Sequence, residues 1–104
     1  MSKKADAQKP FSAELHISDL LLEVAVEVAG AERKYSPFNS AHEGYAVILE
    51  EVHELWDEVK KGGSSPRDPA AMRKEAIQIA AMALRFVRDV SDDRRKLTSA
   101  ELGG

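Results

Sequence analysis

Apolar side chains recur every three or four residues along three segments of the chain, which is the spacing of one face of an α-helix. The first segment, residues 18–34, is apolar around most of its circumference, apart from a narrow stripe with Glu23 and Glu27. Such a helix must be buried on more than one side, although its valines would also suit a strand. The second segment, residues 40–61, divides into an apolar arc and an acidic arc. The third, residues 68–90, is apolar on nearly every side, so we expect it to be the central helix.

Local signals mark the ends of the second and third helices. Ser40 is a good N-cap, and Glu43 three residues later completes a capping box. Gly62 is a plausible residue to end the second helix. Asp68 followed by Pro69 is the favoured order of N-cap and first helical residue, so the third helix is expected to begin there.

These elements predict an all-α fold, an antiparallel bundle of three main helices with short connections. Residues 1–11 are polar and are expected to form a flexible tail, while residues 12–91 form the helical domain. Residues 92–104 are either a tail or a short fourth helix. Three helices leave apolar surface, including Trp56, that is hard to cover within one chain. We therefore expect the bundle to be completed by dimerisation, as a homodimer or a tetramer.

Composition narrows the possible functions. The formal net charge is −3, which argues against a general nucleic-acid binder with a basic face. The chain has no cysteine, which excludes disulfides, thiolate metal sites and cysteine nucleophiles. No apolar run approaches the roughly 20 residues that span a bilayer, and the polar start lacks the apolar stretch of a secretory signal. We expect a cytoplasmic protein with no membrane contact.

The acidic arc of the second helix is the feature that points most directly to function. Its members are Glu43, Glu50, Glu51, Glu54, Asp57 and Glu58. Like charges three or four residues apart repel by roughly 0.2–0.5 kcal/mol per pair, so the arc either faces water or holds a cation. Taken alone, a solvated face is the simpler interpretation. Glu75 makes a bound cation the better interpretation, because it lies on an otherwise apolar helix, where an unpaired carboxylate is costly. The alternative is that the dipole at the N-terminus of that helix stabilises Glu75.

Helical rise predicts which carboxylates meet. In an antiparallel hairpin, Glu54 and Glu75 lie about 10 Å and 9 Å from the connecting turn at 1.5 Å per residue. Glu51 and Gln78 are also nearly level, at about 15 Å and 14 Å. The four side chains can therefore form an oxygen cluster. Oxygen donors suit Mg²⁺, Mn²⁺ or Ca²⁺ rather than Zn²⁺, and Mg²⁺ typically combines a few carboxylates with waters and substrate phosphates.

The same residues match a family pattern. Glu51-x-x-Glu54 followed by Glu75-x-x-Gln78 resembles the ExxE…ExxD signature of the all-α nucleoside triphosphate pyrophosphohydrolases, the MazG-like superfamily. The likeness extends over residues 18–90, and this part of the chain is similar to the small MazG-like proteins of phages and bacteria. It implies hydrolysis of a (deoxy)nucleoside triphosphate to the monophosphate and pyrophosphate, in a dimer or a pair of dimers. The three glutamates would be metal ligands, with Mg²⁺ or Mn²⁺ as the cofactor.

The resemblance also suggests a role for Glu50, and Gln78 is the one position of the motif where this sequence differs from the family. Glu50 would bind metal or orient the attacking water. Gln78 occupies the place of the family's aspartate, and its amide oxygen can ligate a hard cation but brings no charge. Metal affinity should therefore fall. The sequence leaves open an active variant or a non-catalytic helical module that binds a nucleotide or a protein partner.

Four further residues are candidates for contact with substrate. Asn39 and His42 lie at the start of the second helix, where they could touch a nucleobase, although a histidine in this place is more often a partly exposed surface group. Lys74 and Arg85 flank the Gln78 side of the third helix and could neutralise phosphate charge. The simpler interpretation of both is a solvated cation on a helix edge.

Overall fold

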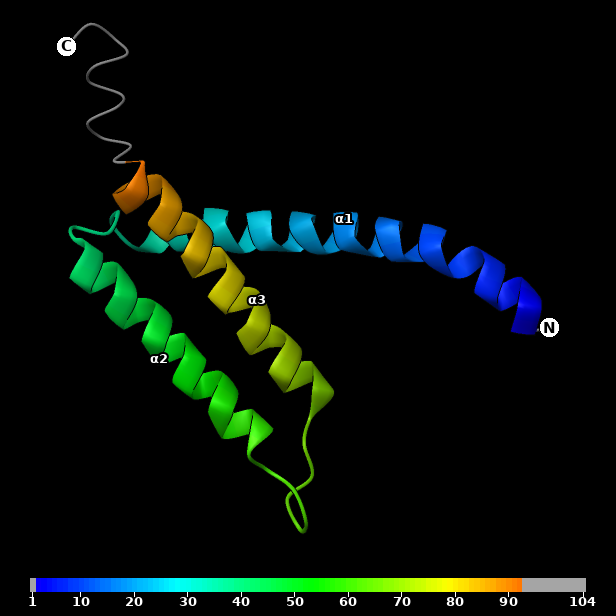
Figure 1. The fold of residues 1–104 in the computed structure, drawn as a ribbon. Coiled ribbons are helices and arrows are strands. Elements are labelled where there is room, and N and C mark those ends of the chain that lie inside the picture. The colour runs from blue at the N-terminus through cyan, green and yellow to red at the C-terminus, as the bar shows by residue number, and fades with distance from the viewer. Residues whose placement is uncertain (1, 93–104) are drawn as a thin grey trace, which may run out of the picture.

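The structure, a computed structural model, describes residues 2–92, with side chains from residue 16 onward. It is all-helical, as predicted. The elements are α1 (Ser2–Lys34), α2 (Ala41–Val59), α3 (Pro69–Phe86) and η1 (Val87–Ser91), a π-helical turn that continues α3. Figure 1 shows α2 and α3 side by side and antiparallel, with α1 crossing them near the start of α2 and the end of α3.

The first helix differs from the prediction at its start. It begins at Ser2 instead of near Ser18, and so takes in residues 2–11, which were expected to form a flexible tail. That stretch is polar but contains few residues that forbid a helix, so composition alone did not define the boundary. The short fourth helix considered for residues 92–104 falls almost entirely outside the described residues.

The third helix is central, as its apolar circumference predicted. It packs against both α1 and α2. The small core contains Val24, Ala31, Phe38, Ala81 and Met82. These residues come from α1, from the loop between α1 and α2, and from α3. The core is therefore concentrated where α1 crosses the hairpin of α2 and α3.

Capping follows the sequence signals closely. The Ser40 hydroxyl accepts a hydrogen bond from the Glu43 N–H at 3.0 Å. The Glu43 carboxylate in turn accepts from the Asn39 N–H at 2.5 Å, one residue earlier than in the standard capping box. Asp68 accepts from the Ala70 N–H at 3.0 Å, with Pro69 in the first turn. Both helices of the hairpin thus begin at the predicted residues.

The turn between α2 and α3 differs from the prediction that Gly62 ends the second helix. The second helix ends at Val59, and Gly62 lies beyond its cap. The residue with positive φ is Gly63, at 59°. The Ser65 N–H donates to the Gly62 carbonyl at 2.9 Å, which closes a tight turn around Gly63. Glycine is favoured there because residues with a Cβ rarely adopt this conformation.

Two ion pairs attach α1 to the C-terminal half of the molecule. Arg73 donates two hydrogen bonds to the carboxylate of Glu23, at 2.8 Å and 2.6 Å. Arg88 forms an ion pair with Glu32. One pair lies toward each end of the apolar contact made by Val24 and Ala31. One pair therefore links α1 to α3 and the other links α1 to η1.

Apolar surface remains exposed on all three helices. The largest examples are Ile17, Leu21, Leu22 and Val26 on α1, Tyr45, Val52 and Trp56 on α2, and Leu84 on α3. Trp56 is 56% exposed, so it is not part of the core of the single chain. Among the described residues, no helix has the length and apolar character needed to cross a membrane.

Candidate metal centre

Three carboxylates converge between α2 and α3. Glu51, Glu54 and Glu75 each offer one oxygen atom, and these oxygens all lie within 4.8 Å of one another. Glu51 and Glu75 are partly buried, whereas Glu54 is exposed. The antiparallel hairpin therefore brings together the glutamates that helical rise placed at similar heights.

Among the described residues, negative charge outweighs positive charge around the cluster. Burial raises the pKa of Glu51 to about 7, and the nearby charges of Glu54, Glu75 and Glu50 add to the rise. The pKa of Glu75 is also raised, by burial first and then by Glu54, while the charge of Lys74 opposes the shift. Both shifts have the cause expected when carboxylates share a site away from water. An added cation would relieve this repulsion.

Two oxygens in the cluster have no partner within the described part of the protein. They are Oε1 of Glu51 and Oε1 of Glu75, both buried and without a hydrogen bond. A buried carboxylate oxygen is costly unless it is paired or bound to a metal. The three glutamates could therefore hold a metal ion. The all-carboxylate donor set suits Mg²⁺ or Mn²⁺.

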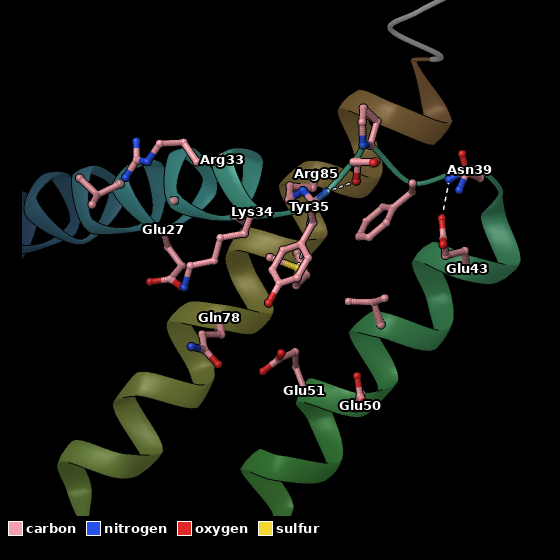
Figure 2. A pocket seen from close by; sticks show the side chains of 18 residues that line it. Glu27, Arg33, Lys34, Tyr35, Asn39, Glu43, Glu50, Glu51, Gln78 and Arg85 are labelled. Carbon is pink, nitrogen blue, oxygen red and sulfur yellow. Dashed lines mark hydrogen bonds between the residues drawn. The ribbon is translucent and has the colours of Figure 1, made fainter.

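A pocket of about 870 Å³ adjoins the cluster and shares Glu51 with it. One side is formed by α2 and α3, where Figure 2 shows Glu51 and Gln78 pointing toward one another. The opposite side is formed by the end of α1 and the loop of residues 35–39. Pockets of 300–1,000 Å³ typically hold small-molecule ligands. A ligand in this pocket would lie directly beside a cation held by the three glutamates.

The other predicted site residues divide into two groups. Glu50, Gln78 and Asn39 line the pocket. His42 and Lys74 are exposed and are not among the lining residues. Lys74 is close enough to affect Glu75, but its side chain does not contribute to the pocket wall.

Arg85 has a structural role that the sequence did not suggest. It lines the pocket, yet it is only 2% exposed. Its Nη2 donates to the carbonyl of Ser36 at 2.8 Å, and its guanidinium lies 4.5 Å from the centre of the Phe38 ring. The hydrogen bond and the ring contact hold the loop between α1 and α2.

Sequence reasoning missed three pocket residues at the end of α1. Arg33 and Lys34 add positive charge to a pocket that is also lined by four glutamates, and Tyr35 presents an exposed ring. The available signal was their position, since this short basic and aromatic run directly precedes the loop that leads into the acidic helix.

Comparison of the chain with protein-family models, curated proteins and solved structures finds no match. The likeness to the MazG-like superfamily therefore rests on the residues themselves. In the structure, Glu51, Glu54 and Glu75 each bring an oxygen within 4.8 Å of the others, and Gln78 lines the adjoining pocket.

Proposed function

We propose that this chain is a metal-dependent nucleoside triphosphate pyrophosphohydrolase of the MazG-like type. The observation that carries the proposal is the cluster of Glu51, Glu54 and Glu75, with two unpartnered buried oxygens, at the edge of a pocket large enough for a nucleotide. The substrate is a (deoxy)nucleoside triphosphate, and the products are the monophosphate and pyrophosphate. The cofactor is Mg²⁺, with Mn²⁺ as a substitute.

The three glutamates hold the cation, and the amide oxygen of Gln78 is available on the pocket side. When bound, the metal supplies Lewis-acid stabilisation of phosphate charge and a lowered pKa for bound water. A water oxygen attacks the α-phosphorus, the bond from that phosphorus to the oxygen bridging to the β-phosphorus breaks, and pyrophosphate leaves. Glu50, exposed within the pocket wall, orients this water and takes up its proton. Lys34 and Arg33 offset the negative charge of the phosphates.

The test is pyrophosphate release from a panel of normal and modified nucleoside triphosphates with Mg²⁺ or Mn²⁺. Turnover is expected with at least one of them. Glu50→Gln should lower kcat by about 10²- to 10⁴-fold, the usual contribution of a positioned base. Asp57→Asn is the matched control, because Asp57 pairs with the exposed Lys60 outside the pocket. Absence of turnover with every substrate at high protein concentration would refute the proposal.

A second candidate is a non-catalytic helical module that binds a nucleotide or a protein partner. Gln78 favours it, since an uncharged side chain stands where the resembled family has aspartate. In this case the protein binds its ligand without hydrolysis. Gln78→Asp should then create activity in an inert protein. Substantial turnover by the unmodified chain would exclude this candidate.

The proposed enzyme acts in the cytoplasm, where nucleoside triphosphates are present, and as a homodimer or a tetramer. Exposed apolar side chains on every helix support self-association. The partner copy would cover surface that the single chain leaves open.

A further inference from the structure

Tyr35 is an exposed aromatic residue inside the pocket wall. Its side chain is 63% exposed, although it follows directly on α1 and precedes the buried Phe38. Figure 2 shows the ring pointing from the loop toward the side of the pocket formed by Glu51 and Gln78. A large ring left open to a pocket is a ready contact for a planar ligand, because covering it removes apolar surface from water.

The backbone around Tyr35 is held at several points. The Tyr35 N–H donates to the Ala31 carbonyl at 2.8 Å, the last helical hydrogen bond of α1. The next carbonyl, that of Ser36, accepts from the buried Arg85 at 2.8 Å. These bonds fix both sides of the residue. The exposed ring is therefore carried by an ordered backbone.

Asp89 adds a further anchor on the same loop. It is only 4% exposed, and its Oδ2 accepts a hydrogen bond from the Phe38 N–H at 3.2 Å. Asp89 belongs to η1, so the π-helical turn after α3 places the acceptor under the loop. A fixed loop spends little ordering entropy on binding, which is the condition under which an exposed ring gains most affinity.

We propose that Tyr35 is the residue on which the substrate's base stacks, and so the base-binding contact of the nucleotide pocket. This inference rests on the proposed function, since it assigns the base of the same substrate. The charged end of a nucleotide belongs with the glutamate cluster and Lys34, which leaves its planar aromatic end to the exposed ring. Stacking alone discriminates weakly among bases because every base has a π-face. Asn39, on the same loop, supplies polar groups for a base edge.

The test compares two ligands in the presence of Mg²⁺ by titration calorimetry. One is a deoxynucleoside triphosphate with an imido bridge between its α- and β-phosphates, which resists cleavage, and the other is inorganic tripolyphosphate, which has no base. Tyr35→Ala should weaken the nucleotide roughly 5- to 150-fold, the range for loss of one stacked base, and leave tripolyphosphate binding unchanged. Tyr35→Phe keeps the ring and should retain the affinity.

Tyr45 provides the matched control. It is also 63% exposed but lies on α2 outside the pocket lining, so Tyr45→Ala should change neither affinity. Equal affinities of Tyr35→Ala and the unmodified protein for the nucleotide would overturn the inference. So would an equal loss for both ligands, which would indicate general damage to the pocket. Because binding is read without turnover, a failure of hydrolysis alone would count against the proposed function and not against Tyr35.

Discussion

Glu51 connects the two parts of the site, since it belongs to the glutamate cluster and also lines the pocket. Its ordinary pKa of 4.5 rises to about 7 in the folded protein. The folded state therefore binds a proton more tightly than the unfolded state. By linkage, this group's contribution to the stability of the metal-free protein is lost as pH rises from about 4.5 to about 7. A bound cation requires the deprotonated form, so its effect has the opposite dependence on pH.

The first prediction at this scale concerns the melting temperature. Mg²⁺ or Mn²⁺ should raise it, because a ligand that binds only the native state stabilises that state by mass action. The increase should be larger at about pH 8 than at about pH 6, since Glu51 then releases its proton without metal. Glu51→Gln should raise the melting temperature of the metal-free protein at the higher pH and reduce the response to metal. A melting temperature that does not change across the metal series would favour a solvated acidic face.

The residues of the site were predictable to different degrees. The meeting of Glu51, Glu54 and Glu75 followed from helical rise and an antiparallel hairpin, both of which depend on local pattern. The hydrogen bonds that hold the loop between α1 and α2 could not be predicted from the local sequence pattern. Arg85 reaches Ser36 across 49 positions and Asp89 reaches Phe38 across 51. Such contacts depend on how α1 crosses the hairpin, which no local signal in the sequence specifies.

At the scale of single elements, the beginnings of α2 and α3 were predictable because each is set by a side chain within three residues of the helix start. The start of α1 was not, since that end lacks a comparable capping signal in the sequence. The π-helical turn η1 was also missed. Its residues read as a simple continuation of α3, and no local signal in the sequence marks the change from α to π geometry.

Replacing two helical glycines with alanine is expected to change the stability of the fold in opposite directions. A Cβ added at Gly44 in α2 would lie 2.6 Å from Cδ2 of Phe86 and 3.1 Å from Cδ2 of Phe38. Gly44→Ala should therefore destabilise the fold by about 1–2 kcal/mol, because overpacking outweighs the gain in helix propensity. At Gly30 in α1, the nearest atom is Nη2 of Arg33 at 4.0 Å.

Gly30→Ala should instead stabilise the protein by roughly 0.5–1 kcal/mol, since only the propensity term acts. Urea unfolding of the two variants beside the unmodified chain measures both effects. If Gly44→Ala were the more stable variant, the close approach of α2 to Phe86 and Phe38 would be wrong. That approach brings the start of α2 against Phe38, which lines the pocket, so the result also bears on the shape of the pocket.

For the whole molecule, the arrangement in Figure 1 leaves much of α1 without a covering layer. α1 packs on α3, and α3 on α2, so the described helices do not close into a complete bundle. Leu22 and Val26 on α1 are 66% and 69% exposed, and Leu84 on α3 is 51% exposed. Apolar surface of this extent usually marks an interface, and a two-fold dimer is the commonest closed solution.

Light scattering at micromolar concentration should therefore give at least twice the chain mass of 11.4 kDa. The interface is expected to run through α1 and α3, so Leu84→Glu should reduce the mass toward that of one chain by burying an unpaired charge. Tyr45→Glu, equally disruptive in kind but on α2, should leave the assembly intact. Both positions are exposed in the single chain, so neither variant is expected to unfold it. Pyrophosphate release that falls together with the assembly in Leu84→Glu would place the partner copy at the site. A single-chain mass for the unmodified protein would contradict the prediction and leave the site to one chain alone.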